Sequence, residues 1–394
     1  MKLMINEGSA GEKRVALDDL ILTKDLPTTA GSKMLDGYVS LFEAEVATRL
    51  QKAGYTIAGK ANVGEFAVDL LGETSYFGAC AKEDGTLVYA ANELVEKGDV
   101  CAALQLDVNG APRRAAALKG QVYVKPTYGT VSRFGTISVA CSGETVGIAA
   151  GTAETCREVL ATVAGYDEKD GTSLPQSMYG QPKEIKKVAI LADITAAADG
   201  ETQAKVAAFQ AFLESKGIAC EKVEVESLSA AKTAWNALMA AELCNNVSRY
   251  DGVKYGYRTP NYTNIDELYT NSRTEAFGEV LKTMILFGSD VLSTNNYQKM
   301  YDKSLRVRRV VAEAFADLFT KYDCVLLPAC AKQRYTLEDV KTNQYLACEE
   351  ALFTAPASIT GLPAVIAGGV QLVGPAFSES SMLDVAEAYG KEGK

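Results

Sequence analysis

The sequence contains no histidine among its 394 residues. Imidazole is the side chain whose ordinary pKa lies nearest neutral pH, so its absence removes a common general base, general acid and metal ligand from any mechanism. The chain also has no stretch of about 18 apolar residues and no recognisable secretory leader. We therefore expect a protein that works without imidazole chemistry and away from membranes.

The nine cysteines are odd in number and form no C-x-x-C pair. Most of them lie among apolar residues, which is typical of buried thiols in a reducing compartment rather than of a disulfide framework or a zinc site. We expect a cytoplasmic protein that holds no metal and needs no cofactor.

The formal net charge of -10 argues against independent binding to nucleic acid, because such binding depends on Lys and Arg side chains that neutralise phosphates. One basic cluster stands apart, at Lys303, Arg306, Arg308 and Arg309. It alternates with apolar residues at helical spacing, which favours a solvated helix face over a phosphate site.

Hydrophobic content of 47% with 23% charged residues is ordinary for a folded globular protein. Residues 1–14 are polar and predict a loose leader, and residues 15–394 predict a single domain. Strands are expected at 55–60, 186–192 and 219–225, with another beginning at 15, and helices at 40–53, 152–164, 203–217 and 229–243. This alternation of strands and helices predicts the α/β class.

The most distinctive motif, KPTYGTVSRFG, occupies residues 125–135 and follows LDVNGAPRRAAA at 106–117. Gly129 suits a tight turn, and Tyr128 can bury its ring while its hydroxyl finds a partner. With the segments EFA, YFG and GLPAVIAGGV elsewhere, these motifs resemble the amidase signature family, most closely its glutamyl-tRNA(Gln) amidotransferase A subunits. The resemblance covers nearly the whole chain, apart from N-terminal helices that the family usually has. It implies the amidase signature fold, in which a large mixed central sheet is sandwiched between helices.

The resemblance also implies where catalytic groups would lie, and this sequence departs from the family at each place. The serine nucleophile aligns with Ala111, the lysine base with Asp18, and the proton-relaying serine with Leu87, in a loop mapped onto residues 85–91. A methyl group has no lone pair with which to attack a carbonyl, whatever base lies beside it. We therefore predict that no catalytic residue of the family is intact.

The positions that hold substrate in the family also differ here. Its arginine pair aligns with Thr283 and Met284, and its substrate-binding aspartate aligns with Ala351. Four residues could be remnants of a ligand site: Asp107, Asn109, Gly110 and Arg113.

Several alternatives stay open for these residues. The carboxylates of Asp18, Asp19 and Asp107 could hold a hard cation, but we favour Asp107 bonding a turn and the other two being exposed or capping. Arg113 and Arg114 could anchor an anion, with a structural buttress favoured.

Cys80 or Cys101 could replace the nucleophile, although a thiol without histidine needs another route to a low pKa.

These observations lead to three hypotheses. The first is a non-catalytic interaction or regulatory protein, beside other amidotransferase subunits or as a homo-oligomer. The second is a small-molecule-binding module that uses the former substrate cavity. The third is a glutamine amidohydrolase or amidotransferase subunit with a rearranged site.

Overall fold

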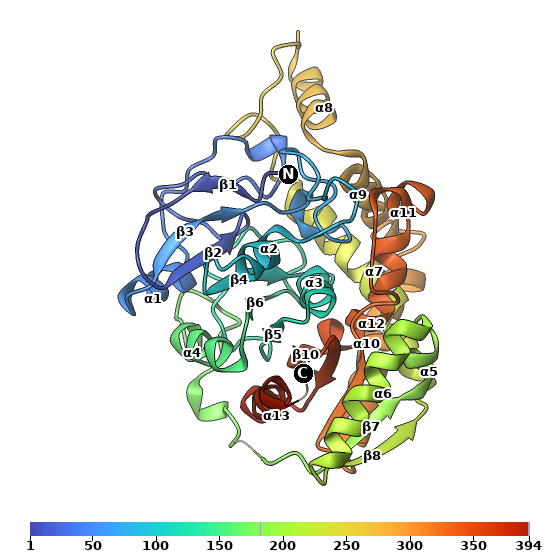
Figure 1. The fold of residues 1–394 in the computed structure, drawn as a ribbon. Coiled ribbons are helices and arrows are strands. Elements are labelled where there is room, and N and C mark those ends of the chain that lie inside the picture. Colours follow the sequence, from blue (N-terminus) through green and yellow to red (C-terminus); the bar gives the residue numbers. More distant parts are fainter. Residues whose placement is uncertain (182, 393–394) are drawn as a thin grey trace.

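The computed structural model describes residues 1–181 and 183–392, which are organised around an 11-stranded sheet (Figure 1). The strand order is β1-β3-β2-β4-β6-β5-β10-β11-β9-β7-β8. The strands are β1 (Met4–Glu7), β2 (Arg14–Asp18), β3 (Thr56–Ala61), β4 (Ala102–Asp107), β5 (Val122–Lys125), β6 (Thr145–Ala150), β7 (Lys187–Leu191), β8 (Ala219–Val223), β9 (Cys324–Pro328), β10 (Ala364–Ala367) and β11 (Val370–Val373).

The sheet is mixed. β2 pairs in parallel with β3 and β4, and β7 pairs in parallel with β8 and β9. The strands from β4 through β6, β5, β10 and β11 to β9 pair antiparallel. Every residue of the central strands β4 and β6 is buried, as expected for strands covered on both faces.

The α-helices are α1 (Glu45–Lys52), α2 (Ala90–Glu96), α3 (Ala111–Lys119), α4 (Ala153–Val163), α5 (Ala192–Ala196), α6 (Gly200–Ser215), α7 (Glu226–Val247), α8 (Ile265–Ala276), α9 (Glu279–Val291), α10 (Lys303–Phe319), α11 (Leu337–Thr342), α12 (Leu346–Thr360) and α13 (Glu379–Glu392). Short 3-10 turns lie at 33–35, 65–67 and 176–178, and a π-turn lies at 298–302.

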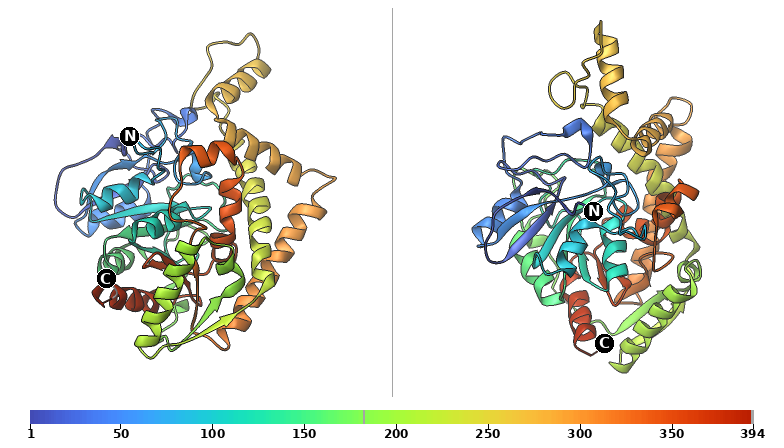
Figure 2. Two further views of the ribbon diagram at one scale, coloured as in Figure 1. Left: turned by 45° about the vertical axis from the view of Figure 1, so that its right-hand side comes forward. Right: turned by 45° about the horizontal axis from the view of Figure 1, so that its top comes forward.

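Helices cover both faces of the central strands. α2 and α3 pack on β4, β5 or β6 and on each other, whereas α4 packs on the same strands and on α1 and α13. α7 packs against α9, α10 and α12 to form a helical layer beside the sheet (Figure 2). α8 extends away from the sheet at the top of Figure 1. Among the described residues, no helix is both long and apolar enough to cross a membrane.

The predicted α/β class, with a large mixed sheet between helices, is confirmed. The predicted strands and helices correspond to β2, β3, β7, β8, α1, α4, α6 and α7, with ends that shift by a few residues. The prediction of a loose leader over residues 1–14 was wrong, because residues 4–7 form β1 and pair antiparallel with β3. A strand of four residues with only Met4 and Ile5 apolar carries little periodic signal, which is why the sequence did not indicate it. The single-domain division stays a prediction.

Candidate functional site

The site is built at the turn between β4 and α3. β4 ends at Asp107, and α3 begins at Ala111 with Pro112 in its first turn, where the missing proline N–H leaves no helical bond unmade. Gly110 between them has a φ of 86°, and a Cβ on it would lie 2.3 Å from the Cβ of Thr354. Both the backbone conformation and the close approach of α12 therefore require glycine.

The start of α3 is held closely against its surroundings. The Asn109 side-chain amide donates to the carbonyls of Val68 and Asp69 at 3.0 and 2.9 Å, and the Thr354 hydroxyl donates to the Asn109 carbonyl at 2.9 Å. Ala111, aligned with the family nucleophile, has no solvent exposure. Its methyl group packs within the hydrophobic core.

Asp18, aligned with the family lysine, is the last residue of β2 and is fully buried. Its Oδ2 accepts hydrogen bonds from the Tyr89 hydroxyl at 2.7 Å and from the Leu106 N–H at 3.2 Å. Burial raises the pKa of the Asp18 carboxyl well above its ordinary value, because the ionised form would lose its hydration. A carboxyl has no nitrogen and carries no positive charge in either protonation state, so it supplies neither the positive charge nor the proton-accepting nitrogen of a lysine.

The segment aligned with the family relay loop folds back on itself. The Val88 N–H donates to the Cys80 carbonyl at 2.9 Å, and the Leu87 N–H donates to the Tyr335 carbonyl at 2.8 Å. Leu87 is buried, and α2 starts at Ala90, so the last residues of the mapped loop are helical.

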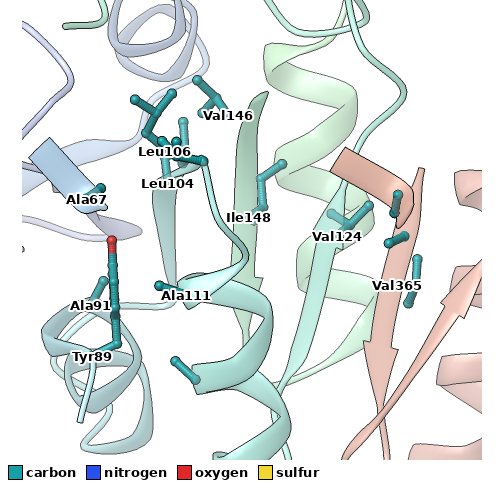
Figure 3. Packing of buried hydrophobic residues seen from close by; sticks show 14 of the residues in the cluster. Ala67, Tyr89, Ala91, Leu104, Leu106, Ala111, Val124, Val146, Ile148 and Val365 are labelled. Carbon is teal, nitrogen blue, oxygen red and sulfur yellow. The ribbon is translucent and has the colours of Figure 1, made fainter. Parts of the chain in front are cut away.

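Tyr89 is the residue that sequence reasoning missed. It precedes α2 and is fully buried, and Figure 3 shows its ring between Ala91 and Ala111, the first residue of the neighbouring helix α3, with the hydroxyl end toward Ala67. Its hydroxyl donates to Asp18. A tyrosine within a segment that is rich in Gly and Ser in the family was the available signal, and the sequence alone did not say where its ring would point.

Arg113 is a buttress in this structure. Its Nε and Nη2 donate to the Asp107 carboxylate at 2.8 and 3.1 Å. Nη2 also donates to the Ser358 hydroxyl at 2.6 Å. Its Nη1 donates to the Thr354 carbonyl at 2.8 Å and to Gln371 Oε1 at 3.0 Å. These bonds occupy all five guanidinium donors. The idea that Arg113 is a ligand-site remnant is therefore corrected, since it has no donor left to offer.

Arg114 is also fully buried but is less completely bonded. Its Nη1 donates to the Leu70 carbonyl at 2.9 Å, and its Nε lies 3.6 Å from Glu350 Oε2. Within the described part of the chain, Nε and Nη2 have no hydrogen-bond partner. The anion-anchoring alternative is therefore open for Arg114 alone.

The three candidate carboxylates do not form a joint cation site. Asp107 pairs with Arg113, and Asp18 accepts from Tyr89, whereas Asp19 accepts from the Thr29 N–H at 2.9 Å. Across residues 1–181 and 183–392, no group of three or more His, Cys, Asp and Glu side chains is placed to bind a metal. The expectation that Asp18 and Asp19 are exposed or capping was wrong, because both are fully buried.

The aligned substrate positions lie in two places. Ala351 is buried in α12, one turn before Thr354, and so lies near the start of α3. Thr283 is exposed on α9, and its hydroxyl donates to the Glu279 carbonyl at 2.9 Å. Met284, the next residue of the same helix, is buried. α9 packs on α7.

Neither candidate cysteine is an activated thiol. Burial raises the pKa of Cys80 to about 12. Burial also raises the pKa of Cys101, whose thiol donates to the Arg14 carbonyl at 3.2 Å. A nucleophilic cysteine needs a lowered pKa, and these surroundings act in the opposite direction.

A comparison with protein families matches residues 14–82 and 95–383 to the family Amidase. This chain belongs to the amidase family. The match is interrupted over residues 83–94, the segment that contains Leu87 and Tyr89. The segment outside the family match therefore contacts Asp18, by the hydrogen bond from the Tyr89 hydroxyl.

This amidase-family protein is similar to the A subunit of glutamyl-tRNA(Gln) amidotransferase from several bacteria. It is 32% identical to the Streptococcus pneumoniae (strain ATCC 700669 / Spain 23F-1) protein over 397 residues, which covers 95% of this chain and 81% of that protein. It is 33% identical to the Coxiella burnetii (strain Dugway 5J108-111) protein over 413 residues, covering 96% and 83%.

Solved structures of related proteins share this fold. The A subunit of the Thermotoga maritima glutamyl-tRNA(Gln) amidotransferase superposes with a TM-score of 0.82 at 25% identity, covering 99% of this chain and 87% of that one. Kluyveromyces lactis allophanate hydrolase, at 21% identity, shares the fold with a TM-score of 0.83 over 98% of this chain and 66% of that one.

Proposed function

We propose that this protein is a catalytically degenerate amidase-family member that serves as an interaction or regulatory subunit beside other amidotransferase subunits. The observation that carries the proposal is the buried methyl group of Ala111 at the first position of α3, where the family resemblance implies the serine nucleophile. No neighbouring base can turn a methyl group into a nucleophile. Losing the nucleophile alone costs a serine hydrolase on the order of a millionfold in rate.

The surroundings of Ala111 support the same proposal. The position aligned with the lysine base is the buried carboxyl of Asp18, whose pKa is raised by burial and which has no nitrogen to accept a proton. The position aligned with the relay serine is Leu87, in the segment where the family match is interrupted. A rearranged active site would need a replacement nucleophile nearby, and the raised pKa of Cys80 does not favour that cysteine.

The surface of α9 supports a partner. Leu286 is 72% exposed and Phe287 is 37% exposed, next to each other on a helix that otherwise packs on α7. Large apolar side chains that gather on a surface are typical of sites where another protein binds. Both bacterial relatives are named as one subunit of an amidotransferase, so we propose that the partner is another subunit of that class.

The experiment is a tagged purification from the native host at ordinary expression level, with the mass and stoichiometry of the complex measured. We expect a stoichiometric complex with an amidotransferase-class subunit. Leu286→Glu should release the partner, whereas Leu41→Glu, the same change at a 92% exposed leucine ahead of α1, should retain it. Recovery of the wild-type chain as a monomer without a stoichiometric partner would refute the proposed role.

A further inference from the structure

A hollow of about 330 Å³ lies on the molecule where the KPTYG motif, α10 and the end of α12 meet. Its polar lining includes Tyr128, Ser142 and Arg308, and its apolar lining includes Ile359 and Leu362. An apolar wall with a few convergent polar groups is the usual lining of a small-molecule site, and the volume lies at the lower end of the usual range.

Arg308 is the one member of the basic cluster that lines this hollow. Arg306 pairs with Asp302 at 2.7 Å and Arg309 with Glu313 at 2.7 Å, and both of these arginines are strongly exposed, as predicted for a solvated helix face. Arg308 is half-buried instead and donates from Nη2 to the Ser142 hydroxyl at 2.7 Å. Its Nε is buried without a hydrogen-bond partner in the described part of the chain. The guanidinium therefore has donor capacity that the protein does not use.

The KPTYG motif forms a fixed wall of the hollow. The Tyr128 N–H donates to the Gly361 carbonyl at 2.9 Å, and its hydroxyl donates to the Cys141 carbonyl at 2.7 Å. Arg133 donates to the Tyr128 hydroxyl at 2.8 Å and lies over its ring at 4.9 Å. A wall held on several sides loses little freedom when a ligand binds, which favours affinity.

The charges around the hollow limit what it can accept. The Ser142 N–H donates to Glu242 Oε2 at 2.9 Å, so a carboxylate lies behind the serine that Arg308 contacts. Arg133 is paired with Glu144 at 3.3 Å. In the described part of the chain, Arg308 is the only cation that lines the hollow. Within that part its guanidinium makes no direct ion pair, and Glu242 is reached only through Ser142. A carboxylate brings one negative charge to this guanidinium, whereas a phosphate dianion would bring a second one towards Glu242 with no second cation in the described lining.

We propose that this hollow binds a small carboxylate, with the carboxylate on Arg308 and a short apolar tail against Ile359 and Leu362. The site is separate from the α3 turn and does not depend on the proposed interaction role. No chemical step is implied, since the ligand is held and not transformed.

The test is saturation-transfer difference NMR on the full chain with propionate, titrated to obtain a dissociation constant. Propionamide, the neutral molecule of nearly the same shape, is the ligand control. We expect propionate to bind about tenfold or more tightly than propionamide, because a charge-assisted hydrogen bond is lost in the amide.

Two substitutions on α10 complete the design. Arg308→Gln should weaken propionate binding by about tenfold or more, and Arg309→Gln should leave it unchanged, because Arg309 is exposed and pairs with Glu313. Circular dichroism and thermal unfolding confirm that both variants are folded. Equal binding of propionate and propionamide, no binding at all, or equal weakening by both substitutions would overturn the proposal. Displacement of propionate by a much lower concentration of inorganic phosphate would overturn the choice of a carboxylate.

Discussion

Two positions in the first turn of α3 differ in what they contribute. At the start of the helix, Ala111 is a methyl group in a hydrophobic core, beside a segment where the family match is interrupted. Two residues later, Arg113 makes hydrogen bonds with all five donors to β4, α12 and β11. One position has the groups that hold the fold together, and the other lacks the group that the resemblance assigns to chemistry.

Membership of the family and the chemistry that the resemblance implies therefore rest on different residues of α3. The Arg113 contacts join three elements that lie far apart in the sequence, so a change there would damage the whole sheet-to-helix junction. Ala111 contributes only packing, and the fold does not depend on a hydroxyl at that position. A fold can persist while the chemistry of its site changes, and we propose that this has happened at Ala111.

The largest expected effect comes from Arg113→Met, which leaves the Asp107 carboxylate buried with only the 3.3 Å contact from Tyr123. Removing one member of a buried ion pair costs roughly 3–5 kcal/mol. We expect a loss of that order in the free energy of unfolding, measured by denaturant titration. A loss below about 1 kcal/mol, as for a surface ion pair, would contradict the buttress role.

Gly110→Ala should be the next most damaging change. The new methyl group would meet Thr354 at 2.3 Å in a left-handed backbone conformation, and we expect a cost of roughly 1–3 kcal/mol. Gly120→Ala is the matched control, because Gly120 ends the same helix with a φ of 61° but with no atom within 4 Å of the added Cβ. The unfolding temperature of Gly110→Ala should be well below that of Gly120→Ala. Equal losses would show that the contact with Thr354 adds no cost.

Asp18→Asn should stabilise the protein at neutral and higher pH. The folded state holds the Asp18 proton more tightly than the unfolded state, so wild-type stability falls as pH rises above the ordinary aspartate pKa and towards the raised value. Asparagine does not titrate, so we expect the stability of the variant relative to wild type to rise as pH increases from 4 to 8. Urea unfolding of both proteins across this range is the measurement. If the stability of the variant relative to wild type fell as pH rose from 4 to 8, the pKa of Asp18 would be lowered in the folded state and not raised.

Tyr89→Phe should have the smallest effect of the four. It keeps the buried ring and removes only the 2.7 Å hydrogen bond to Asp18, which is worth about 0.5–1.5 kcal/mol. Tyr89→Ala also removes the ring and should cost roughly 3–5 kcal/mol. If thermal unfolding gave the same small loss for both variants, Tyr89 would not fill the space beside Asp18.

Much of the fold could be predicted from the sequence. The strands with continuous apolar residues, such as 186–192, and the helices with clear periodicity, such as 152–164, are specified by local pattern. The family motifs at 106–117 and 125–135 identified the remaining architecture. β1 was missed because its four residues alternate weakly and depend on pairing with β3 for their conformation.

The candidate site was less predictable. Alignment placed Asp18, Leu87 and Ala111, but the burial of Asp18 and the orientation of Tyr89 depend on contacts between segments about seventy residues apart.

The basic cluster shows the same limit. Its helical spacing predicts a solvated face for Arg306, Arg308 and Arg309 alike. Only the packing of α10 beside Ser142 distinguishes Arg308 from its neighbours. That contact joins residues 166 positions apart, so no local pattern could have indicated it.

The most direct test of the central claim is ammonia release from glutamine and asparagine by the purified wild-type chain, compared with an Ala111→Ser/Leu87→Ser/Asp18→Lys variant. We predict no release by the wild-type chain above an enzyme-free blank. Activity that appears only in the variant would add that the site can be rebuilt in this fold. Catalytic release of ammonia by the wild-type chain would contradict the account, because it would require a nucleophile other than the residue at position 111.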